Sequence, residues 1–504
     1  MLAAIRSAAV LGIDAYDVTV EVDAATGLPQ FTIVGLPAGA VKESRERVGA
    51  ALVNSGFQVP PRRITVNLAP ADVRKDGTAF DLPIALGILV ATKQLEPRHV
   101  QGITAVGELG LDGALRAVRG ALPIARRLAA AGERTLVLPP PNVAEASLVS
   151  AARLSAPETL ASLIAALRAG VLPAAVASAS VEPGAAEAPD LAEVVGQAGA
   201  KRALEIAAAG GHNLVMVGPP GAGKTMLARR LPGILPALAE GEALEVTAIH
   251  SVAGLLAPGA PLLLTRPFRA PHHTISDAGL IGGGSPPRPG EVSLAHHGVL
   301  FLDELLEFRR HVVESLRQPL EDGSVTIARA KMAVTFPARF TLVGAMNPCP
   351  CGGAGDPARS CRCAVAEIAR YRARLSGPML DRVDMHVHVG AVGVRALGEG
   401  VSGERSADVR ARVERARSQQ RERYAAVPGV GANAHAPPRF SDRHFGVERA
   451  ARDVMAAAAE RLGFTARAYH RTLRVARTIA DLDGSDAVGA AHVAEAVGYR
   501  PPQP

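Results

Sequence analysis

The pattern of apolar and polar positions divides the first 170 residues into short strands and helices. Three runs of apolar and β-branched residues between polar ends are typical of strands: 31–37, 62–70 and 134–140. Two stretches repeat apolar residues at helical spacing and end at a glycine: 40–56 and 158–170. The N-terminal stretch also predicts a strand. We therefore expect a first domain of mixed strands and helices at residues 1–170.

The pattern changes three times along the rest of the chain. Residues 171–190 are mostly Ala, Pro, Ser, Val and Glu without a period, which is typical of a linker. Residues 191–391 alternate apolar strands with helices and predict an α/β domain that binds a nucleotide. Residues 392–504 predict a helical lid. Its arginine-rich stretch at 405–423 favours a solvated helical face over a face that contacts nucleic acid.

Composition and charge exclude some functions and permit others. A chain of 504 residues predicts two to four domains. No apolar run reaches the about 18 residues that a membrane span needs, and the N-terminus lacks the features of a signal peptide, so we expect a cytoplasmic protein without a membrane partner. The formal charge of +7 permits binding to a polyanion.

One motif predicts a phosphate-binding loop. The sequence GPPGAGKT fits the pattern G-x-x-x-x-G-K-[ST], follows an apolar strand and precedes a helix, as such a loop requires. The backbone N–H groups of the loop can turn around phosphate oxygens at the positive end of the helix. We expect Lys224 to reach the β- and γ-phosphates of ATP and Thr225 to bind Mg²⁺. The expected ATP-binding residues are Gly218, Pro219, Pro220, Gly221, Ala222, Gly223, Lys224 and Thr225.

Two further strands end in residues suited to hydrolysis. The sequence GVLFLDEL places Asp303 and Glu304 directly after a buried strand, whose end should lie at the edge of a parallel sheet. We expect Asp303 to hold Mg²⁺ and Glu304 to polarise the attacking water. The strand FTLVGAMNP ends at Asn347, which can position the same water. Together with the loop, these residues predict NTP hydrolysis.

The motifs taken together resemble the YifB/ComM family of magnesium-chelatase-like AAA+ proteins. They include RPFRAPHHTISDAGLIGGG, NPCPCG, YRARLSGPMLDRVD and ARAYHRTLRVARTIADL. The resemblance implies a P-loop ATPase core with a helical lid, and a homo-oligomeric ring, expected to be a hexamer, because each ATP site needs two subunits. It assigns Arg382 as the arginine finger and Arg467 as the sensor-2 residue, with Arg471 as the alternative register. An ion pair of Arg382 with Asp381 or Asp384 is the structural alternative.

The resemblance also implies two inserts that face a central pore. The first covers 251–274 and the second is a β-hairpin at 322–336. Basic residues at such tips can follow a phosphate backbone with little sequence preference. The histidines can equally serve as hydrogen-bonding groups within their own loop. The DNA-binding candidates are Arg266, Arg269, His272, His273, Arg329 and Lys331.

All four cysteines fall within one short stretch, which does not suit a secreted disulfide framework. They are Cys349, Cys351, Cys361 and Cys363. Four thiolates can form a tetrahedral Zn²⁺ site, although the one-residue spacer within each pair is tighter than usual. The sequence leaves a structural zinc ion and free thiols open.

The first domain resembles the proteolytic domain of Lon-type proteases. Its sequence RKDGTAFDLP matches the loop that carries their nucleophilic serine, but Ala79 occupies the serine position, and Leu122 the position of the paired lysine. An activated hydroxyl needs a base within hydrogen-bonding reach. Proteolysis is therefore disfavoured.

The family resemblance implies an ATP-driven motor that acts on single-stranded or branched DNA, as ComM-type branch-migration helicases do in natural transformation. A protein-remodelling or chelatase-like ATPase is the alternative.

Overall fold

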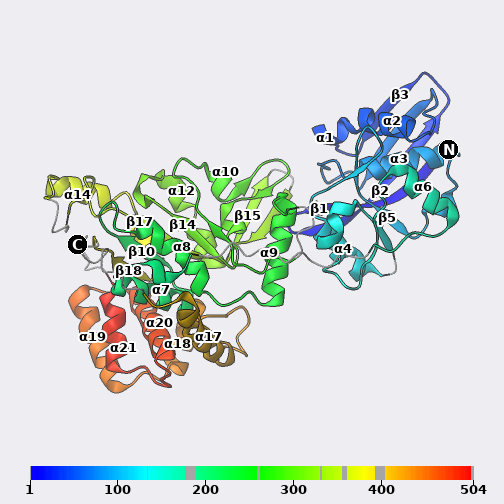
Figure 1. Cartoon of the computed structure of the whole chain (residues 1–504). Coiled ribbons are helices and arrows are strands. Elements are labelled where there is room, and N and C mark those ends of the chain that lie inside the picture. Colours follow the sequence, from blue (N-terminus) through cyan, green and yellow to red (C-terminus); the bar gives the residue numbers. More distant parts are fainter. Residues whose placement is uncertain are drawn as a thin grey trace.

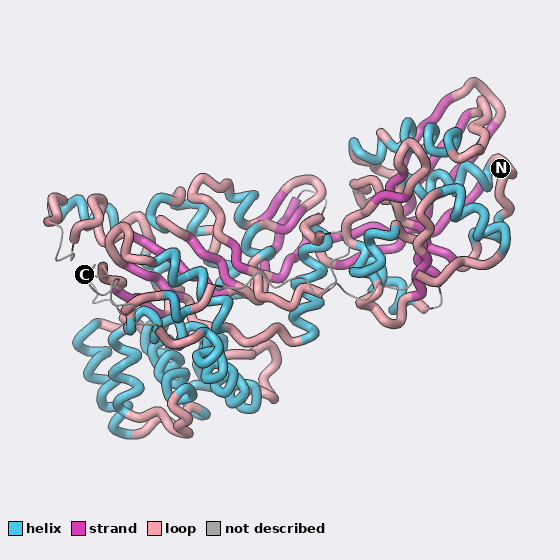
Figure 2. The backbone as a smooth tube through the Cα atoms, viewed as in Figure 1, coloured by secondary structure: helices cyan, strands magenta, loops and turns pink. Residues whose placement is uncertain are grey.

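Three groups of elements follow one another along the chain (Figure 1). The computed structural model describes residues 2–132, 134–175, 189–257, 262–329, 332–354, 360–391 and 403–500. Helices dominate the C-terminal group, whereas the other two groups are built around strands (Figure 2). No helix in the described part of the chain is long and apolar enough to cross a membrane.

The N-terminal group is built on a four-stranded sheet of order β1-β2-β4-β3. The strands are β1 (Leu2–Leu11), β2 (Asp14–Ala25), β3 (Gln30–Val34) and β4 (Arg63–Ala69). Helix α3 (Asp81–Ala91) is buried at every residue and packs on β1 and β2. A smaller parallel sheet contains β5 (Ile103–Ala105), β8 (Thr135–Val137) and β9 (Arg153–Ser155). Around them lie α1 (Gly39–Lys42), α2 (Ser44–Asn54), α4 (Ala121–Ala131), α5 (Val143–Ala146) and α6 (Leu160–Ala169).

The predicted strands and helices of this group are confirmed, with the helix at 40–56 divided into α1 and α2. Ala79 is partly buried and Leu122 is fully buried in the apolar interior. The likeness to a Lon-type protease stays a prediction.

The central group contains a five-stranded parallel sheet of order β11-β14-β17-β10-β18. The strands are β11 (Phe268–Arg269), β14 (Val299–Leu302), β17 (Thr341–Met346), β10 (Leu214–Val217) and β18 (Met385–His388). Successive residues of a strand point to opposite faces. Accordingly, Leu214 and Met216 belong to one hydrophobic cluster, and Val215 and Val217 belong to another. Burial on both faces explains the continuous apolar runs of these strands.

Helices and short strands surround this sheet. Helices α7 (Ala198–Gly210) and α8 (Lys224–Ile234) pack against each other, and α7 also contacts β18. Helix α9 (Glu240–Ala253) lies on the side that faces the N-terminal group (Figure 1). The remaining elements include α10 (Asp277–Leu280), α11 (Glu291–Leu294), α12 (Arg310–Glu314), α13 (Arg317–Asp322), α14 (Val365–Arg372), α15 (Gly377–Leu380) and the hairpin β15 (Ser324–Arg329) with β16 (Met332–Pro337).

A buried polar contact joins the N-terminal and central groups. The Glu145 carboxylate accepts hydrogen bonds from the Ser251 hydroxyl of α9 at 2.5 Å and from the Asn142 amide at 2.7 Å. The N–H of Leu122 also donates to this carboxylate at 3.4 Å. Burial raises the pKa of Glu145, while these hydrogen bonds lower it. Helix α4, whose second residue is Leu122, thus helps to hold the central group.

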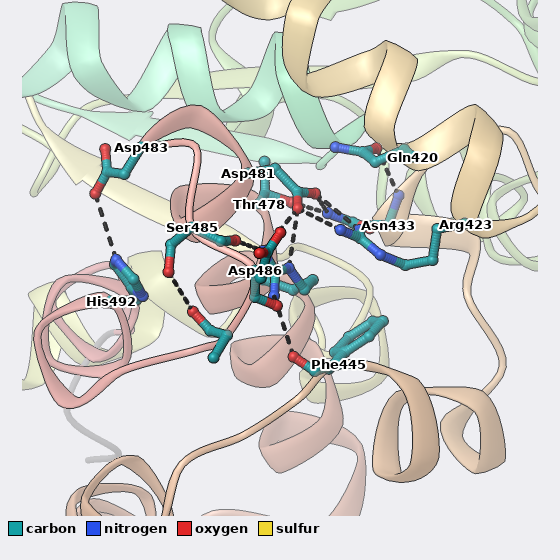
Figure 3. Close-up of polar contacts among 12 residues, drawn as sticks. Gln420, Arg423, Asn433, Phe445, Thr478, Asp481, Asp483, Ser485, Asp486 and His492 are labelled. Carbon is teal, nitrogen blue, oxygen red and sulfur yellow. Dashed lines mark hydrogen bonds and ion pairs between the residues drawn. The ribbon is translucent and has the colours of Figure 1, made fainter.

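The C-terminal group consists of helices held by a buried polar network. They are α17 (Ser406–Arg423), α18 (Pro438–His444), α19 (Arg449–Leu462), α20 (Ala466–Leu482) and α21 (Ala490–Gly498). Figure 3 shows Asn433 at the centre, where its Nδ2 donates to Asp481 at 2.8 Å and to Thr478 at 3.0 Å. Arg423 forms two hydrogen bonds to the same aspartate, at 2.6 and 2.9 Å. The network fixes α17 against α20.

We expected the arginines of residues 405–423 to face solvent. This expectation is wrong for several of them. Arg417 of α17 donates two hydrogen bonds to the carbonyl of Ala208 at the end of α7, at 3.0 and 3.2 Å. Arg410 donates to the carbonyl of Gly233 in α8. Arg412 forms an ion pair with Glu205 of α7. Helix α17 therefore packs against its neighbours through its arginines, whose guanidinium groups donate hydrogen bonds to carbonyls at the C-terminal ends of α7 and α8.

The Asp384 carboxylate joins the parallel sheet to the helical lid. It accepts the N–H of Asn213, at the start of β10, at 3.0 Å and forms an ion pair with Arg471 of α20 at 2.6 Å. Asp384 is 3% exposed. Burial raises its pKa, but Arg471 and the nearby His212 hold the pKa well below the usual range. The Asp384 carboxylate is therefore charged, and its charge is balanced by these partners.

We predict that Asp384→Asn lowers the free energy of unfolding by about 3 kcal/mol, because it leaves the Arg471 guanidinium without its buried counter-ion. Urea denaturation followed by circular dichroism measures this change. The matched control is Asp381→Asn, a partly exposed neighbour for which the described residues show no ion pair, and it should change the value by less than about 0.5 kcal/mol. Equal stability of the two variants would contradict the role given to Asp384.

Candidate nucleotide-binding and hydrolysis site

The phosphate-binding loop connects β10 to α8, as the sequence predicts. Gly218 follows the strand, and a Cβ at this position would lie 2.1 Å from the carbonyl oxygen of Val389. Only glycine fits there. Gly223 precedes α8 with a φ of 88°, in the left-handed region that glycine adopts without steric cost. The loop therefore presents its backbone at the N-terminal end of an eleven-residue helix, where anions bind favourably.

The Lys224 ammonium lies inside this loop. It donates to the carbonyl oxygens of Gly218 at 2.7 Å and Pro219 at 2.9 Å, and to Asn347 Oδ1 at 3.2 Å. Burial lowers the pKa of Lys224, whereas the nearby Asp303 and Glu304 raise it. A buried cation held by neutral oxygens can exchange some of these contacts for phosphate oxygens, which are stronger partners.

The Mg²⁺ residues predicted from the sequence lie side by side. Thr225 donates its hydroxyl to Asp303 Oδ2 at 2.6 Å. A hydroxyl and a carboxylate in this arrangement, with water, supply the hard oxygen ligands that Mg²⁺ requires. The donor set thus fits a Mg²⁺ ion beside the loop.

Glu304 lies at the same edge of the sheet. Its backbone has a φ of 52°, which is uncommon for a residue with a side chain, and its N–H donates to Asp303 Oδ1 at 3.0 Å. The side chain is 60% exposed. A water molecule can therefore reach the carboxylate.

His273 lies beside Glu304 and was not assigned to the hydrolysis site from the sequence. Its Nδ1 is 3.6 Å from Glu304 Oε2, and its ring lies tilted against that of His272 with centroids 4.1 Å apart. His272 instead bonds the Thr274 hydroxyl at 2.9 Å. The two adjacent histidines were the only sign of this contact in the sequence. Because they precede Glu304 by about thirty positions, the sequence did not reveal that His273 lies beside it.

The arginines expected to act at the ATP site differ in their surroundings. Arg382 is 5% exposed and pairs with Glu321 at 2.5 Å, rather than with Asp381 or Asp384. Arg471 is engaged by Asp384. Arg467 is exposed, and the described residues provide it with no hydrogen bond or ion pair. The roles of Arg382 and Arg467 stay predictions, and the pairing of Arg471 favours Arg467 as the sensor-2 residue.

The DNA-binding candidates also differ. Arg266 donates to three backbone carbonyls and to Glu242, and Arg269 makes two hydrogen bonds to Glu291, at 2.6 and 2.8 Å. Both guanidinium groups thus have partners within the chain. Arg329 is the last residue of β15; its side chain and the whole of Lys331 lie outside the described residues. Their contact with DNA stays a prediction.

The four cysteines lie together in the loop after β17 and form no disulfide with one another. Cys349 is buried, whereas Cys351 is exposed.

The loop, the lysine, the paired threonine and aspartate, and the parallel sheet define a P-loop ATPase core of the α/β class. Three family models match the chain: "Magnesium chelatase, subunit ChlI" at residues 190–397, "Subunit ChlI of Mg-chelatase" at 20–142, and "Magnesium chelatase, subunit ChlI C-terminal" at 403–500. The chain is similar over nearly its whole length to two bacterial proteins. One is "Competence protein ComM" of Haemophilus influenzae, 45% identical over 99% of this chain and 97% of the relative.

The other is "Uncharacterized protein YifB" of Escherichia coli, which is 42% identical over the same shares of both chains. A shorter match links the chain to the "Magnesium-chelatase 38 kDa subunit" of Rhodobacter capsulatus, 29% identical over 31% of this chain and 49% of the relative. The chain therefore belongs to the magnesium-chelatase-like family that includes ComM and YifB. This family is one of AAA+ ATPases, which implies ATP and Mg²⁺ as cofactors.

We predict that Glu304→Gln still binds ATP but lowers kcat at least about 100-fold, because the amide cannot accept a proton from the attacking water. Lys224→Ala should instead lose most of its ATP affinity, because it removes the cation from the loop. Steady-state hydrolysis and titration with a fluorescent ATP analogue separate the two effects. A Glu304→Gln variant that cannot bind ATP would show that Glu304 is a structural residue.

We predict that His273→Ala lowers kcat about 10-fold and leaves KM for ATP nearly unchanged, because His273 contacts Glu304 and not the phosphate loop. His272→Ala is the matched control, since its ring nitrogen bonds Thr274. The two variants should have indistinguishable melting temperatures. Equal kcat values would contradict a positioning role for His273.

Proposed function

We propose that the chain is an ATP-driven, ring-forming motor that acts on single-stranded or branched DNA, as a branch-migration helicase does. The observation that carries the proposal is the similarity to a competence protein along 97% of that protein, in a chain with a complete set of hydrolysis residues. Competence is the uptake of DNA, and ATP hydrolysis can drive the movement of a protein along DNA.

The mechanism follows from the contacts at the sheet edge. Lys224 leaves the carbonyls of Gly218 and Pro219 for the β- and γ-phosphates. Thr225 and Asp303 would hold Mg²⁺, and the ion would supply positive charge beside the phosphate oxygens. Glu304 accepts a proton from the attacking water, and Asn347 orients that water. Lys224 and Thr225 begin α8, Asp303 and Glu304 follow β14, and Asn347 follows β17, so all of them lie at one edge of the sheet.

The ring gives Arg382 its proposed role. In the single chain its guanidinium donates to Glu321 and to the carbonyl of Pro378. For Arg382 to reach the ATP of a neighbouring subunit, the pair with Glu321 must open on assembly. Before assembly, the ion pair with Glu321 holds the Arg382 side chain in place. Opening this pair costs little energy because Glu321 is half-exposed.

The hairpin β15–β16 is the proposed contact with the DNA backbone. Its strands pair from Ser324↔Pro337 to Arg329↔Met332, so Arg329 lies next to the turn. A basic turn can bind phosphates without reading bases, which suits a motor that moves over any sequence. The alternative, a chelatase-like or protein-remodelling ATPase, needs the same hydrolysis site but no DNA.

The test is the rate of ATP hydrolysis by purified protein without nucleic acid, with a single-stranded oligonucleotide and with a forked duplex. We predict stimulation by DNA that falls as salt rises, because phosphate contacts release counter-ions. Lys224→Ala serves as the control for contaminating ATPases. The double variant Arg329→Ala, Lys331→Ala should lose the stimulation and keep basal hydrolysis, whereas Arg449→Ala, an exposed lid arginine, should keep both.

Hydrolysis that is indifferent to both DNA substrates would contradict the DNA assignment. Stimulation by an unfolded protein such as casein, without cleavage, would then favour protein remodelling.

A further inference from the structure

The four cysteine sulfurs form a compact group close to the phosphate-binding loop. Cys349 Sγ lies 3.4 Å from Cys351 Sγ and 3.7 Å from Cys361 Sγ, and the last two are also 3.7 Å apart. With Cys363, all four sulfur atoms lie within 4.8 Å of one another. Two stretches that are separated in sequence, 349–351 and 361–363, supply one pair each.

These distances match a tetrahedral metal centre. A disulfide would require about 2.05 Å between sulfurs. Four thiolates at about 2.3 Å from one Zn²⁺ ion are separated from each other by about 3.8 Å, the edge of a regular tetrahedron. Because every sulfur can reach one common centre, the group fits a single ion better than a cluster in which cysteines bind separate iron atoms.

A backbone N–H group points at one of the sulfurs: Ala354 N lies 3.3 Å from Cys349 Sγ. Four thiolates without a cation would repel one another at this separation. We propose that Cys349, Cys351, Cys361 and Cys363 together bind one Zn²⁺ ion as a structural site.

The location of this site gives it a task in the ATPase core. Cys349 follows the predicted water-orienting Asn347 by two residues. Gly352, the residue after the second cysteine, also lies on the phosphate loop, because a Cβ at this position would be 2.5 Å from Pro220 Cδ. Arg372 of α14 donates to the carbonyl of Pro348 at 3.3 Å. A Zn²⁺ ion would therefore fix the segment that holds Asn347 opposite Lys224.

The first experiment measures metal in the full-length wild-type protein after removal of any affinity tag. We predict one zinc per chain by mass spectrometry, and an X-ray absorption spectrum with four sulfur neighbours at about 2.3 Å. Cys351→Ser and Cys363→Ser should lose most of this zinc, Cys351→His should regain it, and Ser360→Ala, an exposed residue in the same loop, should retain it. Iron in place of zinc, or full zinc content in the serine variants, would overturn the assignment.

A second experiment needs no variant and therefore does not depend on how the variants fold. The chain contains only these four cysteines, so every thiol signal reports on the site. A thiol reagent should react slowly with the native protein and should react with all four thiols, releasing zinc, once a strong chelator is added. Immediate reaction of the exposed Cys351 in the native protein, before any chelator is added, would overturn the proposal.

The inference also predicts a consequence that is separate from DNA. Removal of zinc should raise KM for ATP several-fold in the absence of nucleic acid, because it releases the loop that supports Pro220 and Asn347. The Ser360→Ala variant, treated with the chelator in parallel, should show the same rise in KM for ATP as the treated wild type. If the zinc-free protein keeps the wild-type KM, the ion does not support the nucleotide site.

Discussion

The buried Asp384 carboxylate ties the start of the central strand to the helical lid. It accepts the N–H of Asn213 and pairs with Arg471 of α20, while the Asn213 side chain accepts the N–H of Leu342 in β17 at 2.9 Å and donates to the carbonyl of Arg382 at 3.2 Å. Strands β10, β17 and β18 are therefore fixed at their first residues. Because all three strands run parallel, their carboxyl ends are fixed as well. The residues of the nucleotide site follow these ends.

This constraint explains how short, separate motifs form one site. Lys224, at the end of the loop after β10, donates to Asn347 after β17 at 3.2 Å. Its neighbour Thr225 donates to Asp303 after β14 at 2.6 Å. The proposed zinc site extends the same edge, since the cysteine loop begins two residues after Asn347 and lies against Pro220. The lid is bound to this arrangement by inward-facing arginines of α17 and by the Asn433 network.

The sequence predicted those features that depend on local pattern. The phosphate loop and the strands that lead to Asp303 and Asn347 follow from short motifs whose geometry is set by backbone sterics. The pairing of Arg382 with Glu321, the contact of His273 with Glu304 and the inward arginines of α17 were missed, because each partner is set by tertiary packing between distant segments. A charged side chain looks solvated in sequence whenever its partner lies on another element.

Movement along DNA tests the central claim most directly, since binding and hydrolysis alone are shared with other ATPases. The measurement is the release of a fluorescent strand from a forked duplex by purified protein with ATP and Mg²⁺. The account predicts strand release with ATP, none with a non-hydrolysable analogue and none with Glu304→Gln. Hydrolysis of ATP on the fork at full rate, with every labelled strand still in duplex, would contradict it.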